Sequence, residues 1–478
     1  FAAYCCQAGA VLCGVADRAE RRGLERGETM ARTFSLLTLT ALPLTCAMLA
    51  APRTYFRGAS SQQLLVNRMI GDRVRSKAVQ CVIAAPISDE AVGPVKSSHG
   101  LLSGLQGKAL QVAAADVPTK AEVRGVVPDH CYQRSTLRSM GCVLQSALCT
   151  AACALVGMRI PLTLAAFPLW LGWSAVTGTV AMGLWVLAHE CGHGAFSDNR
   201  VLQDVVGFIL HSALLVPYFS WQRSHAVHHA RTNHITEGET HVPTVVDARA
   251  EFESVGGEAD LKLAKTLGYT PHGVLQVVLH LLVGWPAYLL FGATGGPRYG
   301  LTNHFVPRWP FSTKLWPNKW PSKVWASSAG VAVTLAVLAL WARTAGLTTV
   351  LALYGGPLLV VNAWLVVYTW LQHTDVDVPH LSAKEHTFMR GAFLTVDRPY
   401  GRLFDWLHHR IGSTHVAHHI DCTIPHYHAR EATDRIAEAF PKAYLYDPTP
   451  VHKALWRVAC NCISVKRGDD GRYTWVTP

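Results

Sequence analysis

The chain has 478 residues, of which 50% are hydrophobic and only 16% are charged, so it is poorer in charge than an average soluble domain. Its formal charge of +11 could suit nucleic acid, yet no recognition module accompanies the basic residues, and we expect no nucleic-acid partner. Thirteen cysteines form no C-x-x-C pair, and therefore indicate neither a disulfide framework nor a cysteine zinc site. We expect a membrane protein, because basic residues beside apolar spans anchor them at the cytoplasmic surface.

The first 113 residues are predicted to be an N-terminal extension, which precedes a functional domain over residues 114–478. From Met30 to Gly71 this extension contains several arginines but no acidic residue. Such a composition is typical of an organelle transit peptide, and the run LLTLTALPLTCAMLA resembles the apolar core of a secretory signal. A disordered segment is the third interpretation.

Four apolar runs are each long enough to cross the hydrocarbon core of a bilayer, which takes roughly 17 to 25 residues. They are Met140–Met158, Pro161–Ala188, Val324–Ala342 and Thr344–Gln372. Only Arg159 and Ile160 separate the first two runs, and a single arginine separates the last two, so each pair is expected to form a tight hairpin. Basic residues before the first run predict that both hairpins begin and end on the cytoplasmic side.

Two further apolar stretches, Val205–Ser220 and Thr266–Pro297, are short or interrupted by histidine, proline and glycine. We expect them to lie in the interface or to enter the bilayer without crossing it. A crossing by the first stretch would place the histidines on its two flanks on opposite faces of the membrane. The predicted fold is therefore an all-α integral membrane protein with four transmembrane helices in two hairpins, interfacial helices and a cytoplasmic histidine-rich region.

Three histidine clusters, HECGH, HAVHH and HVAHH, lie at or beyond the ends of the apolar stretches. Residues at i, i+3 and i+4 share one face of a helix, so each cluster projects its imidazoles together. The eight candidate metal ligands are His189, His193, His225, His228, His229, His415, His418 and His419. A ninth candidate, His373, directly follows the fourth run and is expected on the same side of the membrane.

HECGH alone fits the H-E-x-x-H pattern of zinc peptidases, in which Glu190 would be the general base. A catalytic zinc takes three protein ligands, so a peptidase would leave most of the clustered histidines without a role. Eight histidines suit two metal ions that keep open positions for a substrate. The carboxylates that could orient the ligands are Glu190, Asp204, Asp375 and Asp405, and the sequence does not distinguish among them.

A redox-active metal pair between membrane hairpins is well placed to meet a lipid chain. The attack of O2 on an unactivated C–H bond requires a metal cofactor. The chain contains no G-x-G-x-x-G fingerprint and no HPGG haem motif, so the electrons are expected from a separate protein.

The three clusters, in this order and at these separations, resemble the histidine boxes of membrane fatty-acid desaturases, most closely the acyl-lipid Δ12 (omega-6) oleate desaturases. PDHCYQRS at 128–135, RGAFLTVDRPYG at 390–401 and IPHYHAREAT at 424–433 fit the same family. The alanine of HVAHH is typical of the Δ12 branch, whereas omega-3 relatives tend to have isoleucine there. Ala226 and Val227 are departures, because relatives often have arginine in the second box.

This resemblance implies an O2-dependent enzyme that converts oleoyl to linoleoyl chains of membrane phospholipids at a centre of two non-haem iron ions. By this resemblance, the eight clustered histidines would be the iron ligands, and His373 matches the family's additional histidine. It further implies cytochrome b5 and its NADH reductase as electron donors, and an endoplasmic reticulum membrane with a cytoplasmic active site. A transit peptide would instead suit a plastid membrane and ferredoxin.

Several alternatives remain open. An oleate 12-hydroxylase, a conjugase and an omega-3 desaturase would share the same iron site and differ in how the acyl chain lies over it. An intramembrane zinc peptidase and a histidine-lined metal transporter are more distant alternatives. The transporter is disfavoured because the clusters lie at the ends of the spans and not within them.

Overall fold

The computed structural model describes residues 103–249 and 253–476. The predicted targeting segment between Met30 and Gly71 therefore lies outside the described residues. Residues 103–113, which the prediction assigned to the N-terminal extension, include α3 (Lys108–Gln111). Leu105 and Ala109 are buried there in the same apolar core as residues from the C-terminal third of the chain.

Among the described residues, five helical segments are long and apolar enough to cross a membrane. They are Thr136–Gly157, Leu164–His193, Tyr269–Phe291, Trp320–Ala345 and Leu347–His373. Four of them coincide with the predicted spans. The additional segment, Tyr269–Phe291, falls within the stretch Thr266–Pro297, which was expected to lie in the interface or to enter the membrane without crossing it.

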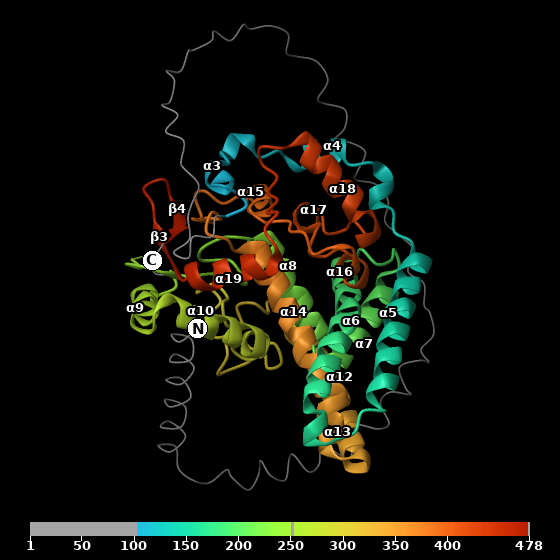
Figure 1. Ribbon diagram of the computed structural model, residues 1–478. Helices are drawn as coiled ribbons and strands as arrows, with labels where there is room; N and C mark the ends of the chain where they lie inside the picture. Colours follow the sequence, from blue (N-terminus) through green and yellow to red (C-terminus); the bar gives the residue numbers. More distant parts are fainter. Residues whose placement is uncertain (1–102, 250–252, 477–478) are drawn as a thin grey trace, which may run out of the picture. The chain divides into compact units, whose positions relative to one another are not determined.

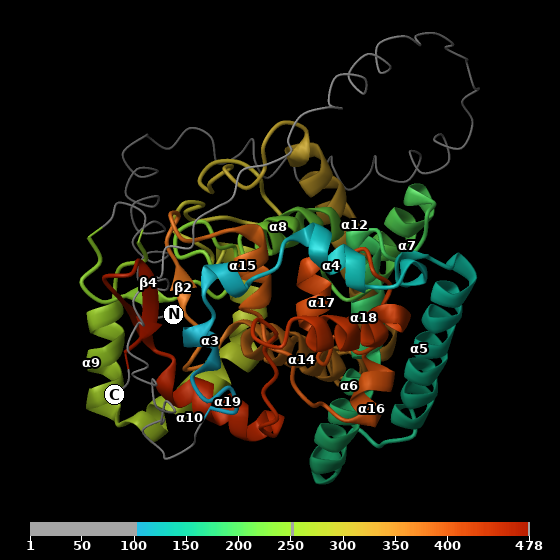
Figure 2. The ribbon, with the colours of Figure 1, turned by 90° about the horizontal axis from the view of Figure 1, so that it is seen from above.

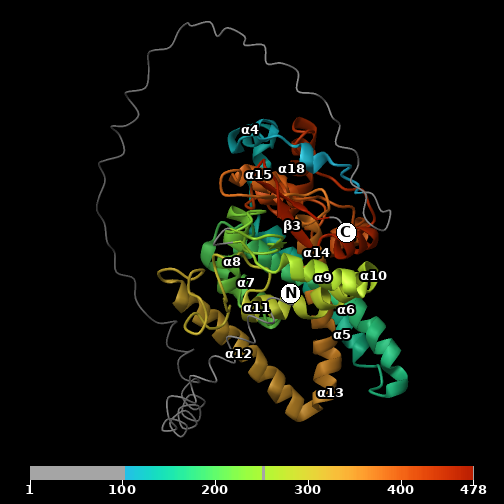
Figure 3. The ribbon, with the colours of Figure 1, turned by 90° about the vertical axis from the view of Figure 1, so that its left-hand side faces the viewer.

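The four predicted spans contain the helices α5 (Thr136–Gly157), α6 (Phe167–His193), α12 (Trp320–Ala345) and α14 (Gly356–His373). Helix α6 packs against both α5 and α14. Its apolar window is 61% buried, compared with 11% for α5, so α6 is the central helix of this group. Figure 1 shows these helices in its lower half, and Figure 3 shows α12 descending to α13 (Leu347–Val350), from which the chain returns through α14.

Local sequence signals set the ends of the two helices that lead to the first histidine cluster. The Ser135 side chain caps α5 by accepting the backbone N–H of Arg138. Pro168 lies in the first turn of α6, where its missing N–H costs nothing. At the other end, Gly194 adopts a left-handed conformation with φ 77° and stops α6 directly after His193.

Large apolar side chains cover the outer faces of the spans. Leu144 and Leu148 on α5, and Val333, Val337 and Leu340 on α12, are each at least 60% exposed. An apolar surface of this extent is unfavourable in water and is satisfied by lipid. The observation confirms that the chain is a membrane protein.

Helices α7 (Arg200–Ala213) and α8 (Tyr218–Ala230) meet at an angle of 104° and form a broken span or a re-entrant loop. The interruption falls at Leu214–Pro217, where proline cannot continue α7. This bent pair contains the stretch Val205–Ser220 and carries the second histidine cluster at the end of α8. A re-entrant loop would not cross the membrane, as predicted, whereas a broken span would.

The remaining helices surround the ends of the spans that carry histidine. They are α4 (Lys120–Val126), α9 (Gly257–Leu267), α10 (Tyr269–Leu279), α11 (Trp285–Phe291), α15 (Phe388–Phe393), α16 (Arg402–Leu407), α17 (His415–Ile420), α18 (His426–Ala439) and α19 (Val451–Asn461). Figure 2 shows α9, α10 and α19 on one side of α17 and α18, and α5 on the other.

The all-α prediction needs one correction, because the described residues also form a four-stranded sheet. Its strands are β1 (Thr244–Val245), β2 (His380–Leu381), β3 (Ser464–Arg467) and β4 (Arg472–Trp475), in the order β1-β3-β4-β2. β1 pairs in parallel with β3, and the other two pairings are antiparallel. These strands are two to four residues long, too short for a periodic pattern to reveal them in the sequence.

Candidate metal centre

All nine predicted histidines converge in the structure. Four elements supply them: the C-terminal end of α6, α8, the last residue of α14, and α17. They fall into two sets that we call set A and set B. Set A contains His189, His193, His225, His229 and His418, and set B contains His228, His373, His415 and His419. The sets adjoin, because the rings of His229 and His419 stack with their centroids 4.0 Å apart.

Distances between ring nitrogens test whether metal ions fit these sets. The Nε2 atoms of His189 and His193 are 3.2 Å apart, as are those of His225 and His229. In set B, Nε2 of His373 lies 3.0 Å from Nε2 of both His228 and His415. Metal–nitrogen bonds of about 2.0–2.1 Å place neighbouring ligand atoms about 2.9–3.4 Å apart, so the observed spacing fits.

Two further nitrogens point to the same conclusion. His418 Nε2 and His419 Nε2 are buried, and neither has a hydrogen-bond partner within the described part of the chain. A buried polar atom without a partner is costly, and coordination would satisfy it. Burial also lowers the pKa of His418 to about 4, which keeps the imidazole neutral and able to bind a metal. The two sets are therefore suited to two metal ions.

Hydrogen bonds from outside the sets orient several of these rings. The Thr240 hydroxyl lies 2.7 Å from Nδ1 of His228, and the Thr232 hydroxyl lies 3.0 Å from Nδ1 of His419. Thr232 also donates to the carbonyl of His228, so its oxygen is free to accept from His419. Partners of this kind fix the ring and the tautomer of a ligating histidine.

A carboxylate holds the third cluster in place through its backbone. Asp397 Oδ1 accepts the N–H groups of His415 and Val416 at 2.5 and 3.0 Å, at the N-terminus of α17. Its other oxygen accepts the hydroxyl of Tyr444. A negative charge stabilises these unpaired N–H groups and the positive end of the helix. The short helix α17 is thereby fixed next to the histidine-bearing ends of α6 and α14.

Only one of the four predicted orienting carboxylates adjoins a ligand directly. Glu190 Oε1 lies 4.0 Å from Nδ1 of His189. Asp204 accepts a hydrogen bond from Tyr218, and Asp405 accepts one from Ser413. Asp375 belongs to a buried ion network that begins two residues after His373.

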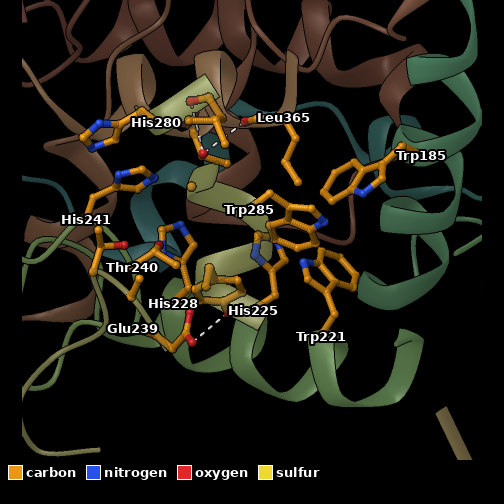
Figure 4. A pocket seen from close by; sticks show the side chains of 16 residues that line it. Trp185, Trp221, His225, His228, Glu239, Thr240, His241, His280, Trp285 and Leu365 are labelled. Atoms are coloured by element: carbon orange, nitrogen blue, oxygen red, sulfur yellow. Dashed lines mark hydrogen bonds between the residues drawn. The ribbon is translucent and has the colours of Figure 1, made fainter. Parts of the chain in front are cut away.

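A mostly apolar pocket adjoins the histidines. Figure 4 shows the indoles of Trp185, Trp221 and Trp285 together at one end, with His241 and His280 at the other. His225 and His228 line the pocket, and the Trp221 indole stacks on His225 with centroids 4.6 Å apart. An apolar ligand in this pocket would lie directly against both sets of histidines.

Comparison with known proteins identifies the class to which this arrangement belongs. The family model described as fatty acid desaturase matches residues 165–449. This chain belongs to the fatty acid desaturase family. The match spans all three histidine clusters and His373, and it confirms the predicted resemblance.

Similar relatives of this desaturase come from plants. The Δ12 fatty-acid desaturase of Vernicia fordii is 40% identical over 360 residues, which cover 74% of this chain and 88% of the relative. The omega-6 fatty acid desaturase, endoplasmic reticulum isozyme 2, of Glycine max is 40% identical over 352 residues, or 72% and 87%. The oleoyl-12-hydroxylase of Ricinus communis is 37% identical over 362 residues, or 74% and 88%.

Sequence reasoning did not find several residues that adjoin the histidines of this desaturase. Thr232, Thr240 and Asp397 support the ligand rings and α17, and Glu239 is a buried carboxyl that lines the pocket. His241, one of several histidines outside the clusters, has its ring 6.1 Å from that of His373. Thr240 lies twelve residues after its partner His228, so only the tertiary fold reveals the contact.

Proposed function

We propose that this desaturase introduces a Δ12 double bond into oleoyl chains of membrane phospholipids and forms linoleoyl chains. The observation that carries the proposal is the convergence of nine histidines in two adjoining sets beside an apolar pocket. The identity to Δ12 desaturases supports the regiochemistry, since several relatives of that name match over most of their length.

Set A and set B would each hold one non-haem iron ion. When bound, the iron pair would supply the O2 activation that removes hydrogen from an unactivated C–H bond. In the overall reaction, two adjacent CH2 groups each lose one hydrogen, and O2 becomes two waters with two electrons and two protons from outside. The nine histidines hold the ions, and Thr232, Thr240 and Asp397 hold the histidines.

The protein's own contribution to selectivity is the position of the acyl chain. The pocket walls of Trp185, Trp221, Trp285 and Leu365 are apolar, so they bind a hydrocarbon chain and exclude water. Because His225 and His228 line the same pocket, its walls decide which carbons lie against the metal pair.

The proposed metal centre fits a chain with four membrane crossings better than a chain with five. His228 at the end of α8 and His373 at the end of α14 are 3.0 Å apart, so an even number of crossings separates them. Helices α12 and α14 already provide two. The segment Tyr269–Phe291 would then be re-entrant or interfacial, and the metal centre would lie on the cytoplasmic side that the basic residues before α5 favour.

The electron source in this proposal is a separate protein, namely cytochrome b5 with its NADH reductase in the endoplasmic reticulum membrane. A location in a plastid membrane would replace it with ferredoxin. The name of the Glycine max relative supports the endoplasmic reticulum.

Expression in yeast, which makes oleate, followed by gas chromatography of the lipids tests the proposal. We expect linoleate from the wild-type chain and none from His228→Ala, because the variant removes one of the four imidazoles proposed to bind the metal ion of set B. His452→Ala, an exposed histidine on α19, is the matched control and should retain activity. A well-expressed wild-type chain that never forms linoleate would refute the Δ12 assignment.

The second candidate is 12-hydroxylation of oleate, which the Ricinus communis relative supports at 37% identity. Both reactions begin at the same carbons and need the same metal centre. Ricinoleate in place of linoleate in the same lipid analysis would favour this candidate, and linolenate would favour an omega-3 desaturase.

A further inference from the structure

A cluster of potential metal ligands lies outside the nine histidines. Cys142 on α5, His409 after α16 and His426 at the start of α18 bring one thiol and two imidazoles together. Their ligand atoms lie within 4.8 Å of one another. The three elements are far apart in the sequence, so the spacing of the cysteines could not predict this cluster.

Each imidazole of this cluster has an orienting partner of its own. The His409 ring lies 3.1 Å from the hydroxyl of Ser146, which is one turn beyond Cys142 on α5. His426 Nδ1 lies 3.5 Å from Glu190 Oε2, and the backbone N–H of His426 donates to the same oxygen at 2.9 Å. One nitrogen of each ring is thus oriented from outside the cluster, and the His426 ring also hydrogen-bonds the Cys142 side chain.

The backbone at His409 has an unusual conformation that directs its ring toward α5. His409 and Arg410 adopt left-handed φ values of 52° and 63°. Residues other than glycine rarely adopt this conformation. The surrounding structure therefore holds His409 against α5, where its ring is buried.

We propose that Cys142, His409 and His426 form a zinc site distinct from the desaturase metal centre. Thiolate sulfur and imidazole nitrogen are both common ligand atoms for zinc, and three protein ligands leave a fourth position open. Ligand atoms around zinc lie about 3.4–3.6 Å apart, so small side-chain rotations would close the present spacing. A cleft lined by Arg138, Arg402 and Arg410 opens beside the cluster and gives water or hydroxide access to the fourth position.

A bound zinc ion would crosslink the elements that supply its ligands. It joins α5, the segment after α16 and α18, next to the third histidine cluster. Glu190 connects it to the metal centre, because the same side chain adjoins His426 on one side and His189 on the other. A small cavity lined by Glu190, His409, His418 and His426 lies between the two sites. By fixing His426, zinc would also fix the Glu190 carboxylate that lies next to His189.

The proposal is tested by metal analysis of the full chain, purified in detergent after growth with added zinc. We expect one more zinc per wild-type chain than per chain of Cys142→Ser or His409→Asn. Cys149→Ser is the matched control, because Cys149 lies on the same helix outside the cluster, and it should keep the zinc. His228→Ala should keep it too, which separates this site from the desaturase centre.

A second measurement needs no variant. Zinc should slow alkylation of Cys142 in the wild-type chain, followed by mass spectrometry, and leave alkylation of Cys149 unchanged. Equal zinc content in wild type and Cys142→Ser, or alkylation of Cys142 that does not respond to zinc, would overturn the proposal. Neither result depends on whether the enzyme forms linoleate.

Discussion

The hydroxyl of Thr240 lies 2.7 Å from Nδ1 of His228, whose Nε2 faces His373 across set B. This contact connects the loop after α8 to the metal centre. It fixes the orientation of the His228 ring and leaves Nε2 as the nitrogen available to a metal ion. Because Thr240 also lines the apolar pocket, one residue contacts both set B and the proposed acyl site.

Replacing Thr240 by valine should weaken metal binding at set B. Valine preserves the shape but removes the hydrogen bond, and loss of such a partner typically costs about 10–100-fold in metal affinity or activity. Thr240→Ser keeps the hydroxyl and should retain most of the iron. Iron content and linoleate formation would be measured together, and equal iron retention in both variants would show that the hydroxyl does not orient His228.

Filling the apolar pocket should reduce turnover without loss of iron. Leu365 is buried on α14 and lines the pocket, so Leu365→Trp places a larger side chain where the acyl chain is proposed to lie. We expect linoleate to fall at least several-fold while the iron content stays at the wild-type level. Leu359→Trp, on the exposed face of the same helix, is the control and should remain active. Unchanged activity of Leu365→Trp would place the acyl chain elsewhere.

The sequence was sufficient for the parts of this protein that repeat a local pattern. Long apolar runs predicted the four spans, and the i, i+3, i+4 spacing predicted the histidines of α6, α8 and α17. His373 followed from its place at the end of a span. Contacts between distant segments were beyond such reasoning, because Thr240, Asp397 and Cys142 gain their partners only when the chain folds. The choice of Glu190 among four carboxylates also required the tertiary structure.

A buried ion network stabilises the segment that follows His373. Asp375 binds Arg398 and Arg457 at 2.6 and 2.5 Å, and Asp447 binds the same two arginines. All four side chains are fully buried. Arg398 also donates to the carbonyl of Leu371, two residues before His373, so the network holds the end of α14.

Asp447→Asn should therefore destabilise the protein strongly. The variant leaves two buried arginines opposite one carboxylate, and breaking a buried ion pair costs about 3–5 kcal/mol. Asp434→Asn is the control, because Asp434 is 65% exposed in its pair with Arg430, and an exposed pair is worth about 0–1 kcal/mol. Thermal unfolding in detergent would compare the two variants. A similar small change in both would mean that the network contributes little to stability.

Glu239 should make the stability of the folded chain depend on pH. Its carboxyl is buried beside the pocket and accepts a hydrogen bond from Tyr288, and burial raises the pKa of Glu239 to about 8. Between its ordinary pKa and pH 8, the folded chain keeps a proton that the unfolded chain has released. The free energy of unfolding should therefore fall as the pH rises through this range.

Glu239→Gln tests this directly, because glutamine is neutral at every pH and can still accept from Tyr288. The melting temperature of the variant, relative to wild type, should rise progressively between pH 5 and pH 8 and then level off, because the wild-type carboxylate is by then fully charged. Glu438→Gln, on the exposed face of α18, should show no such trend. Parallel curves for Glu239→Gln and wild type would mean that Glu239 is already ionised at low pH, with a cation close enough to offset its burial.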